Sequence, residues 1–230
     1  MIFRCKGINI SDSKQIFRQI NANFCTIFCF MCTKTSKVMK RIAILASGEG
    51  TNAENIIRYF SERKTAKVVV VITNKAQAGV LNRADKLGIP TEFIPAQDFT
   101  EGRALEVLHR YQTDFIALAG FLLRVPDDIL HDYPNKIVNI HPALLPKFGG
   151  KGMYGSRVHQ AVIASHEKES GITIHYINER YDEGNTIFQA TCPVLPTDTP
   201  DTLAIRVHQL EYEYFPRVIE ATILGKNLSI

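Results

Sequence analysis

Asn139 and His141 are the two side chains of this sequence best placed to act together on one reacting atom. They lie in segment 137–142, Ile-Val-Asn-Ile-His-Pro, whose apolar residues predict a buried strand that the proline ends. Alternate residues of a strand point to the same side, so both side chains can reach the same atom. An amide donor beside an imidazole suits the oxyanion that forms when a carbonyl or formyl carbon is attacked. The alternative is a strand end whose histidine is bound by the backbone.

Residues 47–53, Ser-Gly-Glu-Gly-Thr-Asn-Ala, form a second candidate site between a predicted strand and a predicted helix. Their glycine spacing is typical of a dinucleotide-binding turn. A nicotinamide-binding domain also needs an acidic residue at the end of the second strand, and that strand ends Thr-Asn-Lys at 73–75, so an NAD oxidoreductase is disfavoured. We therefore expect Gly50, Thr51 and Asn52 to bind one phosphate through backbone N–H groups at the helix N-terminus. A tight turn capped by Asn52 is the alternative.

The elements that must position these residues alternate along the chain. The hydrophobic pattern predicts strands over 41–46, 67–73, 91–94, 115–119, 137–141, 171–177 and 186–194, and helices over 52–63, 79–87, 101–111, 158–165 and 202–224. Pro216 predicts a kink or break in the last helix. The alternation predicts an α/β fold: a doubly wound, mostly parallel, Rossmann-like sheet with helices on both faces and an antiparallel C-terminal edge hairpin. Ligands of such sheets bind beyond the carboxyl ends of the strands.

Composition places the chain among ordinary globular proteins and excludes several classes. The 230 residues carry a net charge of +4, but the first 38 hold six basic residues against one acidic residue, so the remainder carries −1. This charge gives no reason to expect nucleic acid as a partner. No apolar run is long enough to span a bilayer. A single cysteine, Cys192, follows residue 38, which favours a reducing, cytoplasmic location and no disulfide framework.

The first 38 residues differ from the rest in composition. Met39 is followed at once by an apolar strand pattern, so we interpret it as the initiator of a single domain over 39–230 and residues 1–38 as a spurious or disordered leader. A basic, acid-poor targeting peptide is an alternative. The spacing Cys25-x3-Cys29-x2-Cys32 also occurs in iron–sulfur loops of radical enzymes, but the fold predicted for the rest of the chain disfavours it.

Four motifs occur in a characteristic order. They are Ser-Gly-Glu-Gly-Thr-Asn at 47–52, Ala-Gly-Phe-Leu at 119–122, Asn-Ile-His-Pro-Ala-Leu-Leu-Pro at 139–146 and Asp-Glu-Gly at 182–184. Over about residues 40–228 the chain resembles the phosphoribosylglycinamide formyltransferases of the formyltransferase superfamily. The resemblance implies a folate-dependent enzyme of purine biosynthesis. It would transfer the formyl group of 10-formyltetrahydrofolate to the amine of 5'-phosphoribosylglycinamide and release tetrahydrofolate.

The resemblance also implies roles for individual residues. The implied catalytic residues are Asn139, His141 and Asp182. The substrate phosphate would be bound by Gly50, Thr51, Asn52 and Arg103, and the glycinamide or ribose part by Glu211. The folate pocket would be formed by Phe121, Leu122, Leu123, Arg124 and Val125 together with Asn139 and Asp182. No metal is expected, and the only partners expected are the two small-molecule substrates, bound by a monomer or homodimer without nucleic acid or membrane.

Several expectations concern how the site works. Asp182 is expected to raise the pKa of His141 and so favour its protonated form. We expect His175 to support the site, and His159 and His208 to be surface or packing residues. Leu123 occupies a position where the family often has arginine, so the pterin contacts there are open. The glycine-rich segment 148–155 is longer than in the enterobacterial form and is a hypothetical mobile flap.

Other members of the superfamily share the Asn-x-His-Pro and Asp pattern. A methionyl-tRNA formyltransferase would need a further C-terminal domain, and a formyltetrahydrofolate hydrolase a regulatory domain in front. A sugar-nucleotide formyltransferase is usually longer. A nucleotide-binding module without catalysis would have no need of Asn139, His141 and Asp182 together.

Overall fold

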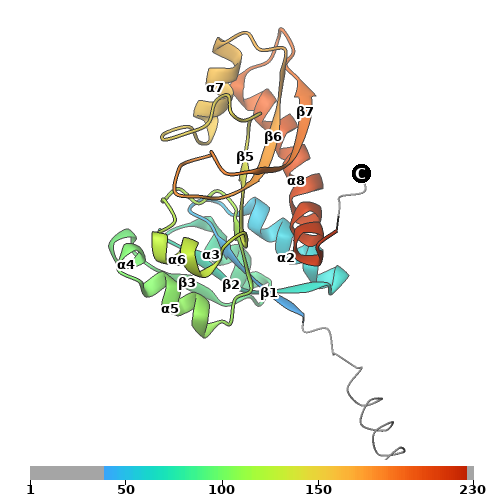
Figure 1. The fold of residues 1–230 in the computed structure, drawn as a ribbon. Coiled ribbons are helices and arrows are strands. Elements are labelled where there is room, and N and C mark those ends of the chain that lie inside the picture. Colours follow the sequence, from blue (N-terminus) through green and yellow to red (C-terminus); the bar gives the residue numbers. More distant parts are fainter. Residues whose placement is uncertain (1–38, 227–230) are drawn as a thin grey trace, which may run out of the picture. The chain divides into compact units, whose positions relative to one another are not determined.

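The computed structural model describes residues 39–226, and a seven-stranded sheet forms the centre of this part (Figure 1). The interpretations of residues 1–38 lie outside the described residues. The strands are β1 Lys40–Leu45, β2 Ala66–Thr73, β3 Thr91–Phe93, β4 Phe115–Leu118, β5 Ile137–His141, β6 Glu169–Tyr176 and β7 Thr186–Pro193. The helices are α2 Thr51–Arg63, α3 Gly79–Lys86, α4 Ala96–Thr100, α5 Arg103–Arg110, α6 Asp127–Asp132, α7 Ser156–Ala164 and α8 Pro200–Leu224.

The strand order is β3-β2-β1-β4-β5-β6-β7. The first five strands are parallel, β6 is antiparallel to β5, and β7 is antiparallel to β6. The short connections between alternating strands and helices force this arrangement. The predicted fold class, including the antiparallel hairpin at the C-terminal edge, is confirmed.

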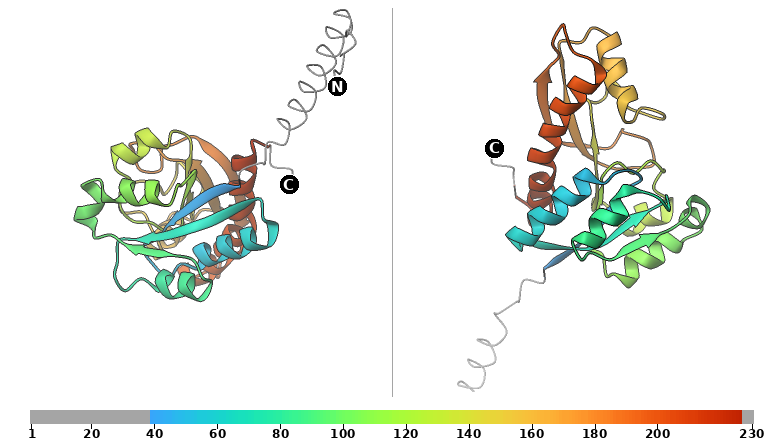
Figure 2. Two further views of the ribbon diagram at one scale, coloured as in Figure 1. Left: turned by 90° about the horizontal axis from the view of Figure 1, so that it is seen from below. Right: turned by 180° about the vertical axis from the view of Figure 1, so that it is seen from behind.

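Each face of the sheet has its own apolar core. Helices α2, α3 and α8 contribute to one core, whereas α4, α5 and α6 contribute to the other. The two groups of helices lie on opposite sides of the strands (Figures 1 and 2). Because both faces are covered, the central strands are buried on both faces, as their continuous apolar runs predict.

The alternating pattern of 171–177 does not mark an exposed face. Thr173 and His175 are completely buried in β6, on the strand whose apolar residues Ile172 and Ile174 are also buried. Strand β6 lies between β5 and β7 and is covered on both faces, so its polar side chains must find partners inside the protein. Thr173 donates to the Ala143 carbonyl at 2.7 Å.

Three local expectations need correction. Helix α8 is continuous from Pro200 to Leu224, so of the predicted kink or break, the break is wrong; Pro216 is buried within the helix. The short helices α4 and α6 were not expected, because five or six residues are too few to show a helical period. Gly102, with a φ of +91°, separates α4 from α5. Helix α5 therefore begins two residues later than the predicted helix 101–111.

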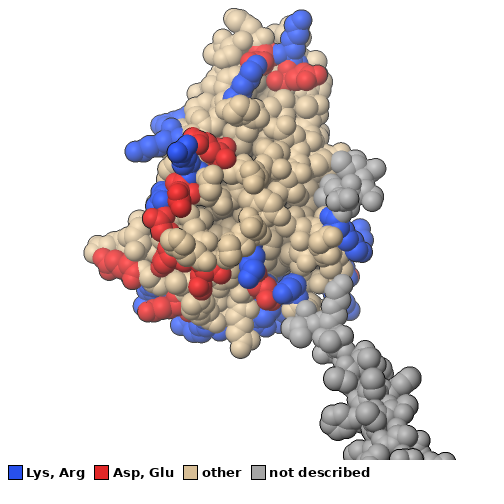
Figure 3. Space-filling view, viewed as in Figure 1, with Lys and Arg blue, Asp and Glu red and all other residues tan. Residues whose placement is uncertain are grey.

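The surface shows no broad area of one charge on the face in Figure 3. There, basic and acidic side chains of the described residues are mixed along the margins, and uncharged side chains occupy the centre. None of the helices within residues 39–226 has the length and hydrophobicity needed to cross a membrane.

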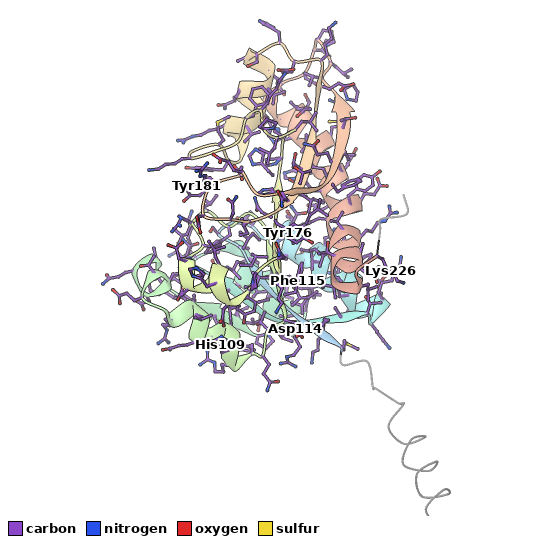
Figure 4. All side chains as sticks on the ribbon, viewed as in Figure 1. His109, Asp114, Phe115, Tyr176, Tyr181 and Lys226 are labelled. Carbon is purple, nitrogen blue, oxygen red and sulfur yellow. The ribbon has the colours of Figure 1, made fainter. Side chains whose placement is uncertain are left out.

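The segment between β6 and β7, residues 177–185, does more than connect a hairpin. Tyr176 at the end of β6 lies opposite Val138, near the amino end of β5. From there the chain runs out to Tyr181 (Figure 4) and returns to the sheet at the start of β7. Gly184 closes this segment against β6, because a Cβ there would lie 1.8 Å from the Tyr176 carbonyl oxygen.

We predict that Gly184→Ala displaces the segment and lowers the free energy of unfolding by about 1–3 kcal/mol, the usual cost of overpacking. Urea denaturation measures this free energy. Gly48→Ala is the matched control, since a Cβ at Gly48 meets nothing within 4 Å. If Gly184→Ala and Gly48→Ala were equally stable, the close approach of Gly184 to Tyr176 would be wrong.

Candidate functional site

A cavity of about 810 Å³ opens at the carboxyl ends of β1, β4 and β5. It is lined by the segments that follow these strands, by the connection between β6 and β7, by residues 150–157 and by one side of α8. The sheet therefore brings together the two candidate sites that are far apart in the sequence. Of the predicted site residues, all except Arg103 and His175 line this cavity.

His141 is held at the end of β5 by two contacts. Its Nε2 lies 2.8 Å from the Phe148 carbonyl oxygen, and its Nδ1 lies 3.6 Å from Oδ2 of Asp182. A carbonyl can only accept a hydrogen bond, so Nε2 carries a proton. Nδ1 is then the nitrogen that gains or loses a proton, beside a carboxylate.

Burial determines the protonation of His141. It lowers the pKa of His141 below the usual 6.5, although the Asp182 charge and the Phe148 carbonyl act in the opposite direction. Asp182 raises the pKa of His141 as expected, but burial outweighs this contribution, so the pKa lies below its usual value. The sequence shows that the two residues can meet; it does not show that His141 is only 3% exposed.

Asp182 lies in the connection between β6 and β7 with a positive φ of 56°. Its Oδ2 accepts a hydrogen bond from the Gly150 N–H at 2.8 Å. Burial raises the pKa of Asp182, but His175, His141 and this N–H favour the carboxylate more strongly, so the pKa lies below its usual value. Asp182 is therefore ionised at neutral pH.

His175 supports Asn139 and not the cavity wall. It is completely buried, and its Nδ1 donates to the Tyr176 carbonyl at 2.8 Å. Its Nε2 lies 3.1 Å from Nδ2 of Asn139, and because an amide nitrogen can only donate, Nε2 is the acceptor of this pair. His175 thus orients the Asn139 amide through one of its N–H groups and leaves the other N–H for the cavity.

The predicted phosphate loop begins α2. Gly50 has a φ of +76°, and a Cβ at this position would lie 2.4 Å from Cγ2 of Val80, so only glycine can be accommodated here. No side chain caps α2, and the alternative of an Asn52 cap is therefore wrong. The Asn52 side chain instead donates to Oε2 of Glu211 at 2.8 Å. The uncapped N-terminus suits an anion.

Glu211 is a buried acid of α8 that faces this loop. It is 4% exposed, and its Oε2 also lies 2.7 Å from Nδ1 of His208. The hydrogen bond to Glu211 raises the pKa of His208 in spite of burial. His208 is exposed and His159 is buried, as expected of surface and packing residues, but both also line the cavity. The three-residue spacing of His208 and Glu211 on one helix could have indicated their pairing.

The predicted folate segment follows β4. Its residues Phe121, Leu122, Leu123, Arg124 and Val125 all line the cavity. Ser47 holds this segment against the phosphate loop, since its hydroxyl accepts from the Leu122 N–H at 3.0 Å and donates to Oδ1 of Asn74 at 2.6 Å. Asn74 at the end of β2 therefore serves the loops and leaves no acid there for a dinucleotide ribose.

Two further observations concern the cavity wall. Arg103 is exposed at the start of α5 and does not line the cavity, so the structure gives no support to its phosphate-binding role. The glycine-rich segment contributes the Phe148 carbonyl and the Gly150 N–H to His141 and Asp182. Both are backbone groups, so residue types in the sequence could not predict these contacts. Within residues 39–226 no group of three or more His, Cys, Asp or Glu side chains is arranged to hold a metal ion.

Comparison with known proteins agrees with this geometry. Residues 40–219 match the family model described as formyl transferase. The chain belongs to the formyl transferase family. It is 39% identical over 189 residues to the chloroplastic phosphoribosylglycinamide formyltransferase of Arabidopsis thaliana. This alignment covers 79% of this chain and 65% of that relative. The chain is 35% identical over 195 residues to the phosphoribosylglycinamide formyltransferase of Bacillus subtilis, with 82% of this chain and 97% of the relative aligned.

A solved structure gives the same result for the fold. Glycinamide ribonucleotide transformylase 1 from Symbiobacterium toebii superposes with a TM-score of 0.76 at 33% identity, over 81% of this chain and 89% of that chain. The chain thus spans less than two thirds of the plant relative's length and most of the bacterial ones. The family resemblance inferred from the four motifs is confirmed.

The position of His141 generates a prediction about titration. In the folded protein its pKa is expected below 6.5, and Asp182→Asn should lower it further, because this change removes the negative charge that opposes burial. An NMR titration of the imidazole C–H signals measures both values. Asp85→Asn, a change at an exposed residue away from the cavity, should leave the His141 pKa unaltered. A His141 pKa above 6.5, or a rise in Asp182→Asn, would contradict this assignment.

Proposed function

We propose that this chain transfers the formyl group of 10-formyltetrahydrofolate to the amine of 5'-phosphoribosylglycinamide, the reaction for which its relatives are named. One observation carries the proposal. Asn139, His141 and Asp182 meet in the cavity whose wall also contains the uncapped N-terminus of α2. An anion-binding helix end and an oxyanion site in one cavity suit a phosphorylated substrate whose amine attacks a formyl carbon.

The phosphate and the amine of the ribonucleotide would occupy different ends of the cavity. Backbone N–H groups of Gly50, Thr51 and Asn52 would bind the phosphate. Glu211, linked to Asn52 by a hydrogen bond, would accept from the ribose or glycinamide part. The folate would lie along residues 121–125, between β4 and the connection that carries Asp182.

His141 and Asn139 would act on the reacting atoms. As the amine nitrogen bonds to the formyl carbon, negative charge develops on the formyl oxygen, and the free N–H of Asn139 donates to it. Neutral His141 accepts the amine proton at Nδ1, where Asp182, 3.6 Å away, stabilises the imidazolium. The bond from the formyl carbon to the folate nitrogen then breaks, and this proton passes to that nitrogen, with Asp182 and water as the relay.

The assay follows deformylated folate by absorbance after the purified chain is mixed with 10-formyltetrahydrofolate, with and without phosphoribosylglycinamide. We expect turnover only with the ribonucleotide. Turnover without it would indicate a hydrolase, and folded protein without any turnover would contradict the proposal. A chain beginning at Met39 is included because residues 39–226 contain every group assigned to the site. We expect it to be active, as the proposed single domain over 39–230 requires.

His141→Ala is predicted to fold and to lose about 10²–10⁴ in kcat, the usual contribution of a positioned general base. Steady-state kinetics with both substrates measure the loss, and thermal unfolding checks the fold. His131→Ala is the matched control, because His131 is exposed on α6 and does not line the cavity. A near wild-type kcat for His141→Ala would refute the assigned role.

A further inference from the structure

His159 is a buried cavity residue that the proposed chemistry leaves without a role. It lies on α7, is 3% exposed and lines the cavity. Neither of its ring nitrogens has a hydrogen-bond partner among residues 39–226, and Nδ1 is shielded from solvent. Nε2 is not among the shielded atoms, so it is the ring nitrogen that a ligand in the cavity can reach.

The surroundings of His159 connect the two ends of the cavity. Burial lowers the pKa of His159, the charges of His208 and His141 lower it further, and the charge of Glu211 raises it. His159 therefore lies within the electrostatic reach of the catalytic end and of the acid that faces the phosphate loop. A ligand that spans these two ends shares the cavity that His159 lines.

The tautomer of His159 follows from the cost of burial. A neutral imidazole carries one N–H, and a buried N–H without an acceptor is rarer than a buried acceptor without a donor. Nδ1 is shielded and has no acceptor, so the proton belongs on Nε2. His159 thus presents a neutral hydrogen-bond donor to the cavity.

Glu211 presents the complementary group. Its Oε2 already receives donors from Asn52 and His208, whereas no donor among the described residues reaches Oε1. The carboxylate can accept one more hydrogen bond, and His159 can donate one. A hydroxyl group, which donates and accepts at once, satisfies both.

We propose that His159 is a substrate-binding residue that selects the ribose of the acceptor, donating from Nε2 to a ribose hydroxyl oxygen whose own O–H donates to Glu211. The proposal rests on the proposed function and adds the recognition of the sugar to it. The hydroxyl lies between the phosphate at α2 and the amine at His141, in the cavity that His159 also lines.

The experiment compares three substrates: phosphoribosylglycinamide and its 2'-deoxy and 3'-deoxy analogues. In wild type, one analogue should lose about tenfold or more in kcat/KM, since a hydrogen-bonded hydroxyl is missing. His159→Phe should lose about tenfold on the ribose substrate, mainly through KM, and little more on that analogue. The KM for 10-formyltetrahydrofolate should stay unchanged. His159→Gln, whose amide nitrogen can occupy the position of Nε2, should restore part of the loss.

The controls separate the possible outcomes. His131→Phe, at an exposed position outside the cavity, should behave as wild type with all three substrates. If His159→Phe unfolds, the comparison rests on His159→Gln. This variant must then show a higher kcat/KM for the ribose substrate than for the deoxy analogue on which wild type loses activity. An unchanged KM for the ribonucleotide in the folded variants, or equal further losses on every analogue, would overturn the role of His159 while leaving the transferase activity intact. Absence of turnover in wild type would overturn the proposed function as well.

Discussion

The site depends on one desolvated carboxylate. Asp182 lies within 3.6 Å of His141 and of His175 and accepts from the Gly150 N–H, so three separate segments converge on it. Burial alone would make its ionisation costly, and these partners more than offset that cost. A buried charge of this kind is tolerated only where its neighbours are fixed. The positions of β5, β6 and the glycine-rich segment therefore depend on one another.

The topology explains how this convergence arises. Strand β5 is the last of the parallel strands, and β6 runs back beside it, so Asn139 lies directly opposite His175. The connection after β6 then leaves near the amino end of β5 and must return to bring Asp182 to His141. Gly184 allows the return by close contact with the Tyr176 carbonyl. At the other end of the cavity, Glu211 joins α8 to α2 through Asn52. The two ends of the proposed substrate would thus be held by different elements around the same sheet.

Much of this arrangement could be predicted from sequence, and the remainder has physical reasons. Continuous apolar runs and helical periods located the strands and long helices, and the paired Asn139 and His141 located the reacting end. The protonation of His141 could not be predicted, because desolvation depends on what packs around β5. His159 and His208 gave no signal by themselves, since only the packing of α7 and α8 brings them to the cavity. Only the resemblance implies a role for Arg103, and the fold leaves this residue outside the cavity. The cytoplasmic location and the monomer or homodimer remain predictions.

The central claim is that His141 and Asp182 act as one unit. A double-mutant cycle on kcat for formyl transfer tests it most directly, with His141→Asn, Asp182→Asn and the double variant compared under saturating substrates. Residues that act as a unit give strongly non-additive losses. The account predicts that the double variant is slower than the slower single variant by no more than about threefold. Losses that multiply in the double variant would show that the two residues contribute independently and would contradict the account.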